Sequence, residues 1–235
     1  MHMKFHILIF VMAACTLFTT AVRTEQVRQI NWENLIPPHL LSVDPLAGFT
    51  QDQKDLVYWV INMLDSLPAR GPETEEFYQE IDEAMPTLRK AGIDIQKVMA
   101  KRNEIRTTIN EALNGQRIRI PGYLLPLEVS GANVTEFLLV PYVGACIHVP
   151  PPPPNQIVHV KVVRKEGYKT KSLYDPVWVT GVISAESMVK DLYLVDGSTG
   201  VNIGYTLQAS QIKPYEMTKQ KGRSRTPPTD QRPME

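Results

Sequence analysis

Cysteine is scarce in this chain of 235 residues, which contains only Cys15 and Cys146. Two cysteines cannot build the disulfide framework typical of small secreted domains. If an N-terminal segment that includes Cys15 is removed, Cys146 has no partner for an intramolecular disulfide. A lone thiol in an exported protein is expected to be buried, to bind a metal or to react.

An excess of charge of one sign is also missing. The chain has 25 Lys and Arg against 25 Asp and Glu, for a formal net charge of +0. Without an overall positive field we expect no nucleic-acid partner and no general attraction to anionic membranes. Hydrophobic residues make up 43% of the chain, enough to build the core of a soluble globular domain.

Several catalytic motifs are absent as well. The sequence contains no Gly-x-x-x-x-Gly-Lys phosphate loop, no Gly-x-Ser-x-Gly elbow, no His-Glu-x-x-His and no dinucleotide-binding Gly-x-Gly-x-x-Gly. Nucleotide-driven work, serine hydrolysis and zinc proteolysis therefore have no support in the sequence.

The first residues have the pattern of an export signal. Lys4 precedes an apolar run from Phe5 to Leu17, and Thr19-Thr20-Ala21 offers small residues for cleavage. We predict a signal peptide over residues 1–21, a periplasmic protein and no integral membrane span after cleavage. Because Met12-Ala13-Ala14-Cys15 is similar to a lipoprotein cleavage box, a lipid anchor at Cys15 is the alternative, and a buried N-terminal helix is a third interpretation.

Residues 22–115 are predicted to form an extended lead-in followed by short α-helices. Thr50 and Gln53 have the spacing of a capping box, which indicates a helix start. The apolar patterns predict three helices: from Thr50 to near Pro68, from Pro72 to Met85 with a break at Pro86, and from Ile95 through Leu113 with a stop at Asn114-Gly115.

Beyond Arg117 the apolar residues alternate as in strands. The predicted strands are Arg117 to Glu128, Thr135 to Val143, Ile157 to Arg164, Val177 to Ser184, Leu192 to Val195 and Val201 to Gln208. They indicate an α+β fold in which residues 116–216 form a small, mainly antiparallel β-barrel or sandwich, with the OB-like barrel preferred. Residues 217–235 are predicted to be a disordered tail.

Three neighbouring segments carry a family resemblance. They are Arg119-Ile120-Pro121-Gly122-Tyr123-Leu124-Leu125-Pro126-Leu127-Glu128, then Glu136-Phe137-Leu138-Leu139-Val140-Pro141-Tyr142, then Gly144-Ala145-Cys146-Ile147-His148-Val149 with five prolines and Asn155-Gln156. This region, from Arg117 to Tyr215, resembles an uncharacterised family of exported bacterial proteins, DUF3299. The resemblance implies a periplasmic or lipoprotein location and an association with ABC-type permease systems and metal-limitation responses. It implies no chemistry, because the family's own chemistry is unassigned.

Cys146 and His148 are the candidate metal ligands. Two residues apart in an extended strand, they point to the same face with α-carbons roughly 6 to 7 Å apart. A thiolate and an imidazole suit Zn²⁺ or Cu⁺, and His159 and Glu128 are the candidates for further ligands. Two alternatives stay open: a packed structural pair, and a nucleophilic Cys146 with His148 as its base.

The proline block that follows is a candidate binding segment. Its residues are Pro150, Pro151, Pro152, Pro153, Pro154, Asn155 and Gln156. The prolines favour a stiff polyproline II rod, after which the two amides can hydrogen-bond where the chain re-enters the sheet. The rod is either a recognition element for an aromatic groove of a partner or only a rigid loop.

These observations favour a non-enzymatic function. We predict an exported periplasmic accessory or binding protein, linked to a metal and associated with a component of an ABC-type transport system. The alternatives are a thiol-dependent envelope enzyme that uses Cys146 with His148, and a purely structural interaction module.

Overall fold

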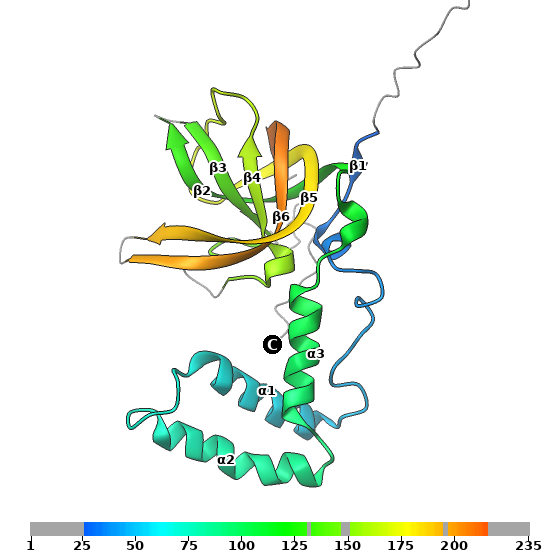
Figure 1. Ribbon diagram of the computed structural model, residues 1–235, viewed down its shortest axis with the longest axis vertical. Helices are drawn as coiled ribbons and strands as arrows, with labels where there is room; N and C mark the ends of the chain where they lie inside the picture. The colour runs from blue at the N-terminus through cyan, green and yellow to red at the C-terminus, as the bar shows by residue number, and fades with distance from the viewer. Residues whose placement is uncertain (1–25, 131–132, 147–150, 195–196, 216–235) are drawn as a thin grey trace, which may run out of the picture.

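A computed structural model of the chain describes residues 26–130, 133–146, 151–194 and 197–215. The predicted signal peptide, the predicted tail, His148 and Pro150 lie outside these residues. Figure 1 shows the helices gathered at one end of the molecule and the strands at the other. Among the helices of the described ranges, none has the length and apolar character needed to cross a membrane.

The structure is α+β, as predicted. Its elements in chain order are β1 (Arg28–Gln29), the 3₁₀ turn η1 (Trp32–Leu35), α1 (Gln51–Ser66), α2 (Glu75–Lys90), α3 (Ile95–Thr107), η2 (Glu111–Leu113), β2 (Arg117–Ser130), β3 (Asn133–Val140), η3 (Pro154–Gln156), β4 (Val158–Val162), β5 (Asp175–Leu194) and β6 (Gly197–Pro214).

The start of α1 confirms the predicted capping box. The Gln53 backbone N–H donates to the Thr50 hydroxyl at 3.3 Å, and the Thr50 backbone N–H donates to the Gln53 side-chain oxygen at 2.9 Å. Two N–H groups that the first helical turn leaves without partners are thereby satisfied. The helix then buries Val57, Val60 and Ile61 against its neighbours.

The predicted break at Pro86 is wrong, because Pro86 lies inside α2 and the helix continues to Lys90. A proline inside a helix removes one backbone hydrogen bond, but the buried Leu88 anchors the final turn in the core. The helix ends instead at Lys90, and after it Gly92, with a φ of +76°, lets Ile93 N–H donate back to Leu88 O at 2.9 Å.

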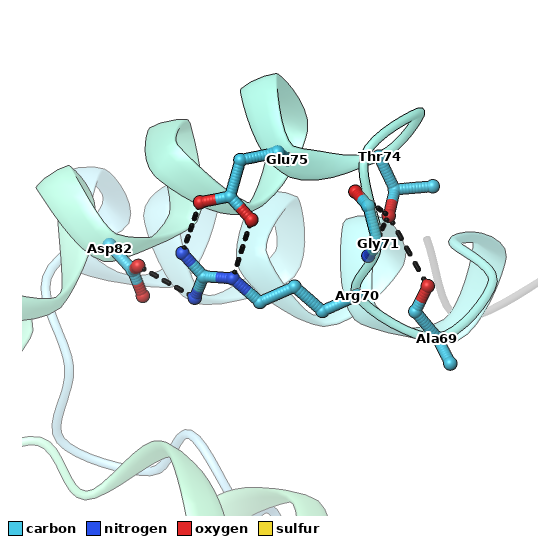
Figure 2. A network of polar contacts seen from close by, with 6 residues as sticks. All are labelled: Ala69, Arg70, Gly71, Thr74, Glu75 and Asp82. Carbon is cyan, nitrogen blue, oxygen red and sulfur yellow. Dashed lines mark hydrogen bonds and ion pairs between the residues drawn. The ribbon is translucent and has the colours of Figure 1, made fainter.

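Figure 2 shows the polar network that orders the turn between α1 and α2. Arg70 donates to both carboxylate oxygens of Glu75, at 2.9 and 2.7 Å, and to Asp82 at 2.9 Å. Thr74 ties the same turn together through Ala69 and Gly71. The loop is therefore fixed by side chains of its own segment.

The third helix is shorter than predicted, ending at Thr107 rather than continuing through Leu113 to Asn114-Gly115. Thr108 is already extended, and the separate turn η2 follows, capped by the side chain of Asn110. Ile109 and Leu113 continue the apolar spacing of the helix in the sequence, which is why a longer helix is predicted. In the structure these two residues lie outside α3 and pack in the core of the sheet.

Five strands pair in a ring. β2 pairs with both β3 and β5, β3 pairs with β4, β4 pairs with β6, and β6 pairs with β5. Of these contacts only β4 with β6 is parallel, while β1 adds a short parallel strand beside β2. The sheet is thus mixed, with mostly antiparallel pairs.

The two strands predicted at Val177–Ser184 and Leu192–Val195 are parts of one long strand, β5. The intervening residues 185–191 include Glu186, Lys190 and Asp191 and show no regular alternation of apolar and polar side chains, so their sequence does not indicate a strand. They stay paired with β6 across a register shift between Ala185 and Met188. The C-terminal half of β5 and the N-terminal half of β6 form the projecting hairpin arm visible in Figure 1.

The ring encloses one of three apolar clusters. Phe137, Leu139, Val158, Val160 and Leu207 are among its buried members. Trp32 and Leu35 from the lead-in also lie in this cluster, so residues near the N-terminus complete the core of the sheet. A second cluster surrounds Cys146, and a third lies between the helices.

Candidate functional site

Cys146 lies in a turn after β3 and packs into the second apolar cluster. It is 9% exposed and has an unusual backbone φ of 69°. The cluster joins the outward side of β2 and β3 to the hairpin arm, and it includes Tyr123, Leu125, Leu138, Val140, Ala145, Ile157, Tyr174, Leu192, Val201 and Ile203. The Tyr174 hydroxyl donates to Ala145 O at 2.6 Å, which holds the turn in place.

Burial raises the pKa of the Cys146 thiol to about 11. The thiol therefore keeps its proton at neutral pH, and a metal or an electrophile would have to meet the cost of removing it. Cys146 does not lie in the predicted extended strand, because β3 ends at Val140 and Cys146 has a left-handed backbone in a turn. His148 lies outside the described residues, so the pairing of its imidazole with Cys146 stays a prediction.

His159, one of the predicted additional ligands, has a different partner. It lies in β4, opposite Leu138 of β3, and its side chain is fully buried. Its Nε2 donates to the Glu136 carboxylate at 2.8 Å, while Nδ1 has no hydrogen-bond partner among the described residues. Burial lowers the pKa of His159, and the bond to Glu136 offsets this only in part.

Glu136 is the centre of this cluster, and the sequence analysis missed it. Lys161 and Lys190 lie 3.7 and 3.6 Å from its carboxylate oxygens. Burial raises the pKa of Glu136, but the hydrogen bond from His159 and the two lysines outweigh burial and hold it below its usual value. In the sequence Glu136 is only one polar position in a predicted strand, and its partners lie on other strands, so no local signal indicates it.

Glu128, the other predicted ligand, is exposed near the end of β2. It lies opposite Glu136 in the β2–β3 pairing, between two register shifts. Across the described ranges, no three His, Cys, Asp or Glu side chains are grouped closely enough to hold a metal ion.

The described part of the proline block runs along the protein rather than away from it. Pro151 is exposed, Pro152 is buried, and Pro153 and Pro154 are half-buried. The φ and ψ of Pro153, −53° and 148°, are close to polyproline II values. Pro154, in contrast, already belongs to the 3₁₀ turn η3, so the predicted rod does not extend to Pro154. The role of the prolines toward a partner stays a prediction.

Asn155 and Gln156 make hydrogen bonds where the chain re-enters the sheet. The Asn155 amide donates to Ile105 O at 2.7 Å and to Thr108 O at 2.9 Å, the carbonyls at the end of α3. The Gln156 amide donates to Trp32 O at 3.0 Å. These two buried side chains therefore join the helices and the lead-in to the strands.

Tyr205 makes a further link of this kind that the sequence analysis did not identify. From β6 its hydroxyl donates to Leu35 O and accepts from Asn110 N–H. Burial raises the pKa of Tyr205 to about 12. The hydroxyl thus stays protonated and holds three distant segments together.

The profile of the family described as "Protein of unknown function (DUF3299)" matches residues 32–214. A crystal structure of a DUF3299 family protein from Pseudomonas aeruginosa PAO1 is 32% identical over 82% of this chain and 99% of that chain, with a TM-score of 0.43. None of the curated proteins matches. The match starts at Trp32 in the lead-in, so it is longer than the region that carried the resemblance, and this chain belongs to the DUF3299 family.

Proposed function

We propose that this protein is an exported accessory or binding protein of the bacterial envelope, with a β module that binds rather than catalyses. The observation that carries this proposal is the environment of Cys146, which is packed among apolar side chains with its pKa raised to about 11. A nucleophilic cysteine needs the opposite, a thiolate favoured by nearby positive charge.

The order of the strands supports a binding role by analogy of fold. Around the ring the order is β2, β3, β4, β6 and β5, with a parallel contact between β4 and β6. We interpret this ring as an OB-like barrel. OB-folds bind ligands mainly on their second and third strands, which here are β3 and β4, the strands of Glu136 and His159. Fold analogy indicates a class of function and not a ligand.

The proposed metal link rests on Cys146 with His148, and Zn²⁺ or Cu⁺ is the metal that this pair suits. His159 and Glu128 remain proposed further ligands. Nδ1 of His159 has no hydrogen-bond partner among the described residues, so it could bind a metal while Nε2 keeps its bond to Glu136. Binding would replace the thiol proton, so affinity should fall as the pH is lowered.

Elemental analysis of protein purified from the periplasm tests the metal link. We expect close to one equivalent of zinc or copper in the wild-type protein and loss of it in Cys146→Ser. His39→Gln is the matched control, because His39 is an exposed imidazole in the lead-in, away from the cluster of Cys146. Equal metal content in wild type and Cys146→Ser would end the metal proposal and leave a structural thiol.

The rate of thiol alkylation separates binding from thiol-dependent catalysis. With Cys15→Ser as background, the rate for Cys146 should keep rising with pH beyond pH 9, because its pKa is about 11. A plateau below pH 8 would instead indicate an activated nucleophile and would favour the envelope enzyme.

The proposed location and transport partner come from the N-terminal pattern and the family resemblance. Cell fractionation followed by intact-mass measurement should find a periplasmic protein lacking residues 1–21. Reversible cross-linking in the envelope should capture a component of an ABC-type transporter. A lipid-modified Cys15 would move the protein to the anchored class, and an uncleaved cytoplasmic protein would contradict the proposal.

A further inference from the structure

Three cations and two aromatic rings share one outer sheet surface. Their backbone pairings put them together: Pro121 of β2 pairs with Trp178 of β5, and Trp178 pairs with Lys213 of β6. The alternating residues of these strands, such as Ile118 and Val179, are buried inside the ring, so this set points outward. We call it the basic–aromatic face, and it consists of Arg117, Arg119, Trp178, Lys213 and Tyr215.

The planar groups of this face hold one another in position. The Arg119 guanidinium carbon lies 4.2 Å from the centre of the Trp178 ring, and the Trp178 and Tyr215 rings are 5.4 Å apart. Arg117 donates to the Ser210 hydroxyl at 3.0 Å. Because these side chains are already ordered, an anionic partner would lose little conformational entropy on binding them.

The cations of the face have no carboxylate partners among the residues that the structure describes. Lys161 and Lys190 share Glu136, and Arg70 is paired with Glu75 and Asp82. No ion pair of this kind involves Arg117, Arg119 or Lys213. The positive charge of the face is therefore available to an external anion.

The sequence has further cations shortly after the last residue of the face. Tyr215 is the last described residue, and its ring packs on that of Trp178. Lys219, Lys221, Arg223 and Arg225 follow within ten residues. The sequence thus has four more basic residues within ten positions of Tyr215.

We infer that the basic–aromatic face docks on a membrane surface rich in anionic phospholipid headgroups. A spread of cations over one sheet surface suits a surface of many phosphates better than a single small anion. Trp and Tyr are the side chains that prefer the level of the headgroups, where one part of the ring system is apolar and the other is wet. Envelope location comes from the proposed function, but the docking itself does not depend on Cys146 or on a metal.

Co-sedimentation with vesicles tests the inference. The purified mature protein, which lacks residues 1–21 and therefore Cys15, is mixed with phosphatidylcholine vesicles that contain either no or about a third phosphatidylglycerol. We expect binding only to the anionic vesicles, with loss of binding at high salt because the interaction is screened. The variant R117Q/R119Q/K213Q should bind at least tenfold more weakly, since each cation near a membrane contributes roughly fivefold.

Two further variants make the result specific. R89Q/K90Q/K97Q removes the same charge from exposed positions of the helical segment and should bind like the parent protein. K213E changes one exposed residue, so it keeps the test valid if the triple variant does not fold, and it should also weaken binding.

Several outcomes would overturn the inference. Equal binding to neutral vesicles would exclude anionic headgroups as the partner, and equal loss in the helical control would show a general charge effect. If K219Q/K221Q/R223Q/R225Q abolishes binding while R117Q/R119Q/K213Q does not change it, the chain beyond Tyr215 acts without the face. Binding to polyglutamate but not to anionic vesicles would assign the face to an acidic polypeptide instead.

Discussion

The helical end and the strand end of this molecule differ in how their charges are arranged. In α2, Glu75, Glu76, Glu80, Asp82 and Glu83 are followed by basic residues only in the last turn, at Arg89 and Lys90. The basic–aromatic face on the strands has three cations and no acidic partner among the described residues. α2 and the basic–aromatic face thus carry charge of opposite sign in a chain of net charge +0, and charge counted over the whole chain could not predict either surface.

The two regions also differ in how much of their charge is neutralised within the protein. Arg70 satisfies Glu75 and Asp82 in the network of Figure 2. Arg119, in contrast, lies against the Trp178 ring, which orients a guanidinium without cancelling its charge. The contacts of a charged residue are therefore more informative about partners than its presence in a sequence.

The largest expected difference between the two ends concerns their phenylalanines. Phe137 is fully buried inside the ring, whereas Phe77 of α2 is 43% exposed. Phe137→Ala should lower the free energy of unfolding by about 3–5 kcal/mol, and Phe77→Ala should cost far less. Urea denaturation followed by circular dichroism measures both. Similar losses for the two variants would contradict the burial that distinguishes them.

A smaller difference is expected between two glycines. A Cβ at Gly181 would overlap the backbone carbonyl of Gln208 on the neighbouring strand, whereas a Cβ at Gly92 meets nothing within 4 Å. Gly181→Ala should cost about 1–3 kcal/mol or more because backbone atoms must move. Gly92→Ala should cost about 1 kcal/mol from its left-handed backbone alone. Thermal unfolding measures the stability of both variants. A larger loss for Gly92→Ala than for Gly181→Ala would contradict the close β5–β6 pairing at Gly181.

The third expected effect depends on pH and separates the buried His159 from the exposed His39. Because burial lowers the pKa of His159 in the folded protein, the unfolded chain takes up a proton first as the pH falls below about 6.5. The free energy of unfolding should therefore be highest above this pH and decline between pH 7 and 5.

His159→Gln should reduce that decline, and His39→Gln should leave it unchanged. Protonation of Glu136 also lowers the free energy of unfolding as the pH falls, but only at a lower pH, because the pKa of its carboxyl group is held below the usual value. Urea titrations at half-unit pH intervals give the slope. A decline of equal steepness in His159→Gln would assign the pH dependence to other groups.

The smallest effect is expected at the exposed network of α2. Arg70→Gln removes the hydrogen bonds to Glu75 and Asp82, but water and salt already screen these ions. Its effect on stability should be slight at low ionic strength and vanish in concentrated salt. A loss that persists in concentrated salt would show that Arg70 stabilises α2 by packing, in which case Arg70→Met should restore stability.

Local patterns predicted the local structure well. The capping box at Thr50 and the alternation of β2, β3, β4 and β6 depend on neighbours within a few residues, which a sequence displays directly. The break expected at Pro86 failed because the burial of Leu88, a tertiary contact, favoured continuation of the helix.

The candidate site was less predictable, because its contacts join distant segments. The bond from His159 to Glu136 spans 23 positions and depends on the register between β3 and β4. Lys190 reaches the same carboxylate only because the hairpin arm folds onto these strands. No spacing in the sequence encodes either contact.

The hydroxyl of Tyr205 has a consequence for how the chain acquires its structure. It bonds to Leu35 O across 170 positions, so the lead-in is synthesised long before the strand that fixes it. The core that contains Trp32 and Leu35 cannot be completed until β6 has been synthesised. Contacts of such long range slow folding and leave apolar surface exposed meanwhile. We therefore expect the lead-in to dock last, and a nascent chain that stops before β6 to depend on chaperones.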